Sequence, residues 1–291
     1  MKRIDVAVVG CGHMGSHHAA AVARNPRCRL VALVDVVTDH AAHLAQEHGG
    51  EVLHGVPEGI DAVIVATPTS THVEVAAPLV DAGMWCLVEK PLAPSAALAV
   101  RLRSGTLVVG HVERFNAAVL SLAPLHPSRM VARRVAPRGA RGLDTDVVHD
   151  LMIHDLDLFL CWAKARIEVQ SVEGGARGGA DEAWAELVAG DFRALLHASR
   201  VARSRARTID LHDTRGRTHL DLIKGTARGP SARPTQDSRD AIARQLDAFL
   251  DAIEGTAPRA VDFAAGSAAL ELADRICALA SSTSEAVAGS V

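Results

Sequence analysis

Short apolar runs alternate with amphipathic segments along the first 122 residues of the chain. The apolar runs are typical of buried strands, and the segments between them are typical of helices. This pattern predicts strands at 4–9, 30–35, 61–66, 85–89 and 106–110, and helices at 14–24, 39–48, 72–82, 95–103 and 115–122. Regular alternation of strand and helix indicates an α/β fold, a doubly wound parallel sheet with helices on both faces.

The pattern changes after residue 122, where prolines and arginines replace the apolar runs. Further along, the spacing predicts a helix at 145–162, antiparallel strands at 167–173, 183–189, 192–201, 206–212 and 217–222, a surface loop at 225–237, and helices at 238–253 and 261–281. We therefore expect a parallel-sheet domain at 1–122 and an α+β domain with a mostly antiparallel open sheet at 123–291. The closing helices could pack back on the first domain.

A glycine-rich loop with the sequence GCGHMG follows the first predicted strand. Gly10 permits a tight turn, Gly12 lets the backbone approach a pyrophosphate, and Gly15 lets helix and strand pack closely. The helix that follows offers free N–H groups to phosphates, so His13 and Met14 at its start are also expected cofactor contacts. In this context the loop predicts a Rossmann dinucleotide site.

Asp35 ends the second strand of this βαβ unit. A carboxylate there accepts hydrogen bonds from the adenosine ribose and repels a 2′-phosphate. The next residues, 36–38, contain no Lys or Arg to receive that phosphate, so NAD is favoured over NADP. Asp35 can also cap the helix that starts near Asp39, and the two roles are compatible.

Composition narrows the possible partners and location. A net charge of −3 favours neither nucleic acid nor membrane as a partner. No apolar stretch reaches the ~18 residues of a membrane span, and the first strand starts too early for a signal peptide. Five cysteines without CxxC spacing indicate reduced thiols in a cytoplasmic protein. His13 and His17 have ligand spacing, but no acid or thiol lies near them in sequence, so no metal site is predicted.

Two loops at the carboxyl edge of the predicted sheet carry candidate chemistry. The first contains Thr67 and Pro68, followed by His72, which could contact the cofactor or make a structural hydrogen bond. The second contains Glu89 and Lys90 before a proline. Because ligands bind at this edge in open α/β sheets, we expect Lys90 at the nicotinamide end of the cofactor site.

The helix predicted at 145–162 carries Asp150, His154 and Asp157 at i, i+4 and i+7. This spacing places all three on one helix face. A carboxylate beside a histidine can orient the ring and stabilise its charged form, which suits a general base. His154 by itself could be a histidine of the core. The presence of Asp150 and Lys90 favours a catalytic role for it instead.

The chain resembles the Gfo/Idh/MocA oxidoreductases over nearly its whole length. The likeness rests on the glycine loop, on Ala66-Thr67-Pro68 with His72, on Glu89-Lys90-Pro91 and on Asp150-x3-His154. The segments 110–116, 150–157 and 198–201 are most similar to the branch that oxidises UDP-N-acetylglucosamine at C3. Ala117 stands where that branch has proline, and the chain is shorter between residues 91 and 109.

The resemblance implies an NAD-dependent dehydrogenase that acts on a sugar or nucleotide sugar. His154 is then the general base, Lys90 hydrogen-bonds the same substrate oxygen, Asp150 binds substrate hydroxyls or orients the site, and Arg114 lies where nicotinamide and substrate meet. The family also implies a homodimer or homotetramer formed through the C-terminal sheet. A free sugar or inositol dehydrogenase and a non-catalytic NAD-binding sensor remain alternatives, although a sensor has no need of Lys90, Asp150 and His154.

An arginine run suggests how a nucleotide sugar could be held. Its members are Arg129, Arg133, Arg134, Arg138 and Arg141. Guanidinium groups pair bidentately with phosphate oxygens, so Arg133 and Arg134 are candidate ligands for a substrate diphosphate. A solvated strand and loop would carry the same residues without that role.

Overall fold

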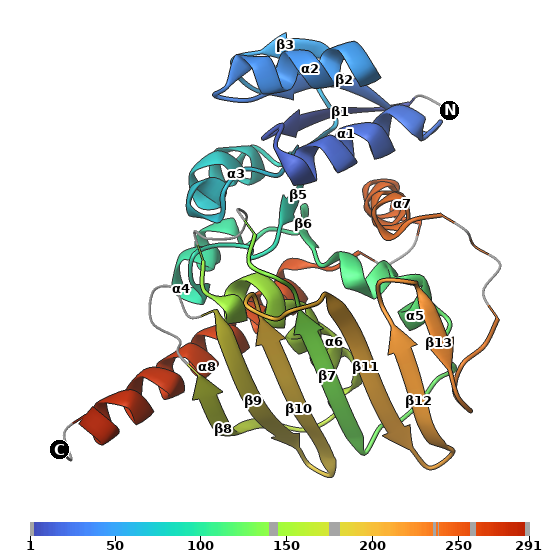
Figure 1. Cartoon of the computed structure of the whole chain (residues 1–291). Coiled ribbons are helices and arrows are strands. Elements are labelled where there is room, and N and C mark those ends of the chain that lie inside the picture. Colours follow the sequence, from blue (N-terminus) through green and yellow to red (C-terminus); the bar gives the residue numbers. More distant parts are fainter. Residues whose placement is uncertain are drawn as a thin grey trace. The chain divides into compact units, whose positions relative to one another are not determined.

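The computed structural model describes residues 3–139, 145–174, 181–234, 237, 239–256 and 260–288, with side chains as far as 280. Its contacts divide the chain into two compact units (Figure 1). The first unit comprises Met1–Val112 and Arg239–Ser267, and the second comprises Glu113–Ser238 and Ala268–Val291. The sequence prediction placed this division after residue 122.

The first unit is built on six parallel strands in the order β3-β2-β1-β4-β5-β6. Their bounds are β1 Ile4–Val9, β2 Cys28–Val34, β3 Glu51–Leu53, β4 Ala62–Val65, β5 Trp85–Glu89 and β6 Leu107–Gly110. Strands β4 and β6 are buried along their whole length, as strands covered on both faces must be. The predicted parallel Rossmann sheet is confirmed, and only the short exposed β3 was not expected.

Helices and 3-10 turns pack with these strands in the first unit. They are α1 His13–Arg24, α2 Thr38–His48, η1 Thr69–Thr71, α3 His72–Asp81, α4 Ala96–Ala99, η2 Val100–Leu102 and α7 Ala241–Ile253. One apolar core joins alternate residues of β1 to α1, α2 and α7. Residues 95–103, predicted as one helix, form the short helix α4 followed by the 3-10 turn η2. Helix α7 packs beside α1 within this unit.

The second unit is built on a seven-stranded sheet in the order β13-β12-β11-β7-β10-β9-β8. Its strands are β7 Arg129–Val135, β8 Ile167–Gly174, β9 Glu182–Ala189, β10 Phe192–Ser199, β11 Ala206–Asp213, β12 Gly216–Asp221 and β13 Thr226–Arg228. β7 runs parallel to β10, and the other pairs are antiparallel. The mostly antiparallel sheet is confirmed, and its central strand, β7, carries part of the arginine run.

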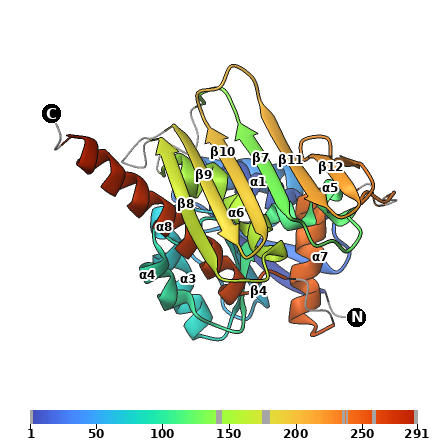
Figure 2. The ribbon, with the colours of Figure 1, turned by 90° about the horizontal axis from the view of Figure 1, so that it is seen from below.

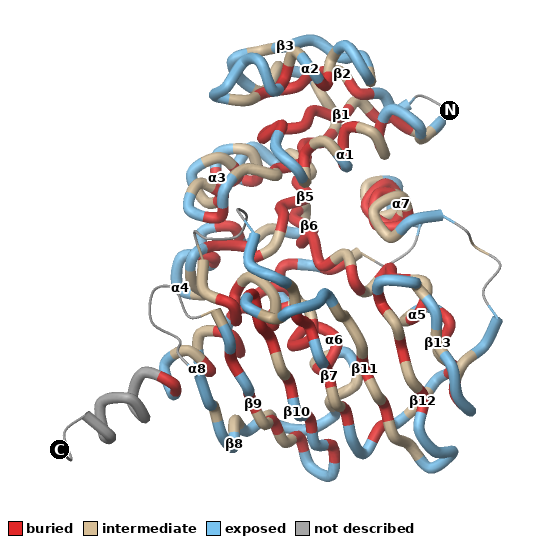
Figure 3. Tube along the Cα trace, in the orientation of Figure 1, coloured by how far each residue is buried: buried red, intermediate tan, exposed pale blue. Residues whose placement is uncertain are grey.

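Helices cover one face of this sheet (Figure 2). The unit contains η3 Val112–Phe115, α5 Ala117–Leu120, η4 Val148–Met152, α6 Ile153–Trp162 and α8 Phe263–Ala288, whose first residues belong to the first unit. Burial alternates along β9 and β10 (Figure 3), and the buried side chains form one core with α6 and α8. Among the described helices, none has both the length and the apolar character needed to cross a bilayer.

Contacts of residues 113–116 explain why the units divide before them. Glu113 forms an ion pair with Arg134 of β7, 2.7 Å between Oε1 and Nη1. Asn116 donates from Nδ2 to the carbonyl oxygen of Leu222 at 2.8 Å. These long-range contacts fasten the segment to the second sheet, and no local sequence pattern identifies them.

Candidate functional site

Two glycines of the loop after β1 have no room for a side chain. Gly10 has φ of +89°, and a Cβ there would lie 2.6 Å from the carbonyl carbon of Ala66. A Cβ on Gly15 would lie 1.8 Å from the carbonyl oxygen of Gly10. The turn and the close helix packing assigned to these two glycines from sequence therefore agree with the backbone geometry.

Gly12 occupies the N-cap of α1 and meets open space instead. No heavy atom lies within 4 Å of an ideal Cβ at this position, and no side chain caps the helix. The backbone N–H groups of the first turn, which includes His13 and Met14, lie at the positive end of the helix dipole. This arrangement fits a dinucleotide pyrophosphate.

Asp35 anchors the glycine loop from the end of β2. Its Oδ2 accepts a hydrogen bond from the N–H of Cys11 at 2.6 Å, and its Oδ1 accepts one from the N–H of Val37 at 2.8 Å. Each carboxylate oxygen has two acceptor positions, so these bonds leave capacity for ribose hydroxyls. The carboxylate thus positions the loop in addition to its predicted cofactor role.

His72 joins the two loops at the carboxyl edge of the sheet. Its Nε2 lies 2.9 Å from the carbonyl oxygen of Thr67, and its Nδ1 lies 2.9 Å from that of Pro91. Burial lowers the pKa of His72, and hydrogen bonding to these carbonyls only partly opposes it. Both ring nitrogens therefore face carbonyl oxygens of the protein, and the neutral ring donates its one N–H to one of them, which favours the structural alternative for His72. In the first of these loops, Pro68 directly precedes the η1 turn. In the second, the Lys90–Pro91 peptide bond is cis.

Glu89 is buried beside His18, with 2.7 Å between Oε1 and Nε2. Burial raises the pKa of Glu89, but hydrogen bonding and charge from His18 outweigh it and hold that pKa below the usual range. Gly110 of β6 packs against the carboxylate, because a Cβ there would lie 3.0 Å from its Oε1. His18 was not among the residues predicted for this site, because no sequence pattern links α1 to the end of β5, 71 residues later.

We expect replacement of Glu89 by Gln to make the stability of the protein less sensitive to acid. A depressed carboxyl pKa stabilises the folded state above the unfolded-state value, near 4.5, and this contribution is lost as pH falls through the folded pKa. The difference in unfolding free energy between wild type and E89Q should therefore stay constant from about pH 7 to about pH 5 and shrink as the pH falls below about 4.5 in urea titrations. The exposed Glu74→Gln is the control, and a pH-independent difference for E89Q would refute the assignment.

In the second unit, Asp150 and His154 occupy successive turns of a distorted helix. Asp150 lies in η4, which is a π-helical turn, and His154 lies in the first turn of α6. Single π turns inside helices frequently mark functional sites. The side chain of Asp150 is 19% exposed, and its Oδ2 lies 3.8 Å from Nη1 of Arg200. Arg200 also donates to the carbonyl oxygen of Thr145 at 2.9 Å.

Arg114 forms a bidentate ion pair with Asp157. The two bonds measure 2.8 Å from Nε to Oδ2 and 2.6 Å from Nη2 to Oδ1. Asp157 is fully buried on α6, whereas the side chain of Arg114 is 24% exposed. The pair holds the guanidinium against the helix that carries His154. Asp157 therefore acts as the ion-pair partner of Arg114.

The structure contradicts the predicted diphosphate role of Arg134. The residue as a whole is 1% exposed, and its guanidinium donates to Asp155 at 3.0 and 2.7 Å and to Glu113 at 2.7 Å. Burial lowers the pKa of Arg134, but the two carboxylates outweigh it and raise that pKa above its usual value. Arg134 is therefore an internal counterion of the second unit.

Arg133 also does not fit the predicted pair. Consecutive residues of a strand point to opposite faces of the sheet. Arg134 shares a face with Met130 and Ala132, which pack in the core with α6, whereas Arg133 is exposed on the other face. The two arginines cannot grip one diphosphate together. Arg138 pairs with Asp181, Arg129 is exposed, and Arg141 lies outside the described residues.

Comparisons with known proteins agree with this arrangement. A family model described as "Oxidoreductase family, NAD-binding Rossmann fold" (GFO_IDH_MocA) matches residues 4–104. The chain is 33% identical to a UDP-N-acetylglucosamine 3-dehydrogenase of Acidithiobacillus ferrooxidans, over 94% of this chain and 96% of the relative. It is 26% identical to an inositol 2-dehydrogenase of Rhizobium meliloti, over 93% and 95%.

The solved structure of the Acidithiobacillus ferrooxidans enzyme has the same fold. It superposes with a TM-score of 0.85 at 32% identity, covering 96% of this chain and 98% of the other. The likeness therefore includes both units, that is, the second sheet as well as the nucleotide-binding sheet.

Proposed function

Because this chain belongs to the Gfo/Idh/MocA family of NAD-binding oxidoreductases, we propose that it oxidises the C3 hydroxyl of UDP-N-acetylglucosamine or a similar nucleotide sugar. Membership makes it a dehydrogenase of the sugar type that acts on CH–OH groups. The observation that carries the finer proposal is the 33% identity, over 94% of the chain, to an enzyme of that name. The second unit is then the substrate-binding domain.

We assign NAD rather than NADP as the cofactor. The glycine loop would hold its pyrophosphate and Asp35 its adenosine ribose, and when bound it accepts the hydride from the substrate carbon. Support for NAD comes from Asp35 and from the exposed apolar Val36 and Val37 that follow it, which offer no charge to a 2′-phosphate.

We expect Asp35→Asn to reduce the preference for NAD+ by about tenfold or more, because a charge-assisted hydrogen bond of about 1.5–3 kcal/mol is weakened. The measurement is kcat/KM with NAD+ and with NADP+. Asp39→Asn, an exposed carboxylate four residues later, is the matched control. An unchanged ratio of the two kcat/KM values in D35N would remove Asp35 from cofactor selection.

The residues of the second unit supply the proton chemistry. His154 removes the proton of the reacting hydroxyl as general base, and Asp150 binds a neighbouring hydroxyl or orients the ring. Arg114, fixed by Asp157, contacts the substrate near the nicotinamide. Lys90, from the first unit, hydrogen-bonds the reacting oxygen and stabilises the charge that develops on it. These roles are supported by the Glu-Lys-Pro and Asp-x3-His motifs at residues 89–91 and 150–154.

A free-polyol substrate is the second candidate function. The inositol 2-dehydrogenase of Rhizobium meliloti matches 93% of this chain, at 26% identity. The loss of Arg134 as a phosphate ligand also removes one argument for a nucleotide sugar. The identity of 33% to the UDP-sugar enzyme keeps the nucleotide sugar first.

Substrate choice is tested by the rate of NADH formation with UDP-N-acetylglucosamine, other UDP-sugars, free N-acetylglucosamine and inositols. The proposal expects kcat/KM to be highest for a UDP-sugar. Turnover of inositols or free sugars alone would replace the nucleotide sugar by a polyol.

We further propose that copies of the chain form a dimer or tetramer through the second sheet. Trp184 and Leu195 are exposed, at 39% and 37%, on the face opposite α6 and α8. Large apolar side chains on an open face are typical of a contact surface. Light scattering of the wild type and of Leu195→Glu tests this, since a monomeric wild type would contradict it.

A further inference from the structure

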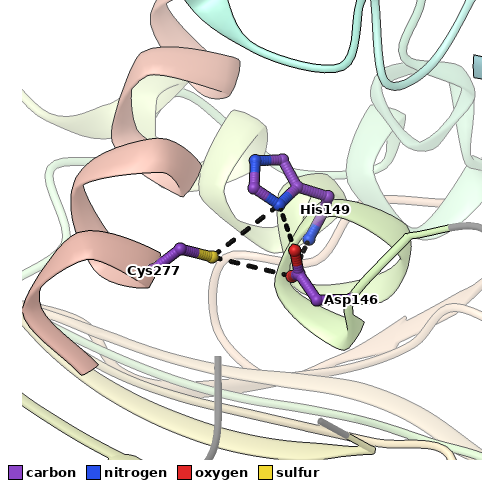
Figure 4. Close-up of side chains that lie close together, drawn as sticks. All are labelled: Asp146, His149 and Cys277. Carbon is purple, nitrogen blue, oxygen red and sulfur yellow. Dashed lines mark hydrogen bonds and ion pairs between the residues drawn. The ribbon is translucent and has the colours of Figure 1, made fainter. Parts of the chain in front are cut away.

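Outside the proposed active site, the second unit gathers three different metal-binding side chains (Figure 4). Asp146 and His149 lie in the turn that begins η4, and Cys277 lies on α8. Figure 4 shows the carboxylate and the imidazole facing the thiol, and their ligand atoms lie within 4.8 Å of one another. The sequence prediction of no metal considered only His13 and His17, since Cys277 and His149 are 128 residues apart in the chain.

The distances within this cluster suit a small tetrahedral ion. The Cys277 sulfur lies 3.6 Å from Oδ1 of Asp146 and 3.7 Å from Nδ1 of His149. Zinc bonds of ~2.3 Å to sulfur and ~2.0–2.1 Å to nitrogen or oxygen place such ligands roughly 3.5 Å apart. The Nδ1–Oδ2 distance is 2.6 Å, a hydrogen bond whose proton the ion replaces as the two atoms separate by roughly 0.7 Å.

A second carboxylate orients the imidazole for this role. Asp274 Oδ1 lies 2.8 Å from Nε2 of His149, so the ring presents Nδ1 to the cluster. Metal-binding histidines almost always donate their other N–H to a carboxylate or carbonyl in this way. Asp274 and Cys277 are spaced i, i+3 on α8, as Asp146 and His149 are in the turn, so two helical pairs face each other.

Asp146 is also held in place before any ion arrives. Its Oδ1 accepts hydrogen bonds from the N–H groups of Val148 at 2.8 Å and His149 at 3.0 Å. The donor set of one carboxylate, one imidazole and one thiolate is softer than magnesium or calcium prefer and suits zinc.

We propose that Asp146, His149 and Cys277 bind one zinc ion, with Asp274 orienting His149 and water completing the coordination. The ion would fasten α8 to the turn that carries Asp150. The zinc site does not depend on which substrate the protein oxidises. Its test measures metal binding by the full chain in the absence of substrate.

Cobalt(II) titration of chelator-treated protein tests the site. One equivalent should produce a thiolate-to-cobalt charge-transfer band, and zinc should displace it. Cys277→Ser should abolish the band, and Asp274→Asn should weaken affinity by about 10–100-fold. The exposed Cys161→Ser is the matched control and should keep the band. Circular dichroism verifies that each variant is folded. Absence of the band in the wild type, or its persistence in C277S, would overturn the proposal.

Discussion

His154→Ala should lower kcat by about 10²–10⁴-fold, the usual contribution of a general base. In the proposed mechanism the substitution leaves the proton of the reacting hydroxyl without an acceptor on α6. Because we propose that the cofactor binds to the first unit, the dissociation constant of NADH should change little. The measurements are steady-state turnover of the best UDP-sugar and a fluorescence titration with NADH.

His126→Ala serves as the control for loss of a histidine in the same unit. This side chain is exposed and lies outside the proposed site, so the variant should retain wild-type turnover. If H154A retains its fold and loses less than about tenfold in kcat, the base lies elsewhere.

Arg134→Met should destabilise the protein by about 3–5 kcal/mol, because it leaves the carboxylates of Asp155 and Glu113 buried without their shared counterion. Both carboxylates lie within 3.0 Å of the guanidinium. The side chains of Arg134, Asp155 and Glu113 are 2%, 3% and 6% exposed, so water cannot replace the lost charge. Urea unfolding followed by circular dichroism measures the effect.

The adjacent Arg133→Met is the matched control, since it removes the same group from the exposed face of the same strand. Surface substitutions of this kind usually change stability by less than about 0.5 kcal/mol. Equal destabilisation by the two variants would contradict the buried ion network.

The parts of the site that depend on short stretches of chain were predictable. Gly10, Gly15 and Asp35 follow from one βαβ unit. The backbone leaves no room for a side chain at the two glycines, and the carboxylate of Asp35 accepts a hydrogen bond from the N–H of Cys11. The position of Asp150 and His154 on adjoining helical turns was predictable from their spacing, whereas the π turn that contains Asp150 was not. Their roles in the reaction stay predictions.

The errors arise where partners are distant in sequence. Arginine is a residue type usually found at the surface. Only the fold shows that Asp155, 21 residues away, neutralises Arg134. His18 meets Glu89 across 71 residues, and Cys277 meets His149 across 128. From its neighbours in sequence, a charged side chain is expected to lie at the surface. A buried charge needs a partner, and the local sequence pattern does not specify which residue that partner is.

In the proposed reaction the carbon at C3 of the sugar gives up its hydrogen to the nicotinamide. This transfer is measured by incubating the protein with NAD+ and UDP-N-acetylglucosamine that carries deuterium at C3, followed by mass spectrometry of both products. We expect deuterium in the reduced nicotinamide and a 3-keto sugar. Deuterium retained in the sugar while NADH accumulates would show that another carbon is oxidised, and the absence of any turnover would contradict the proposed substrate.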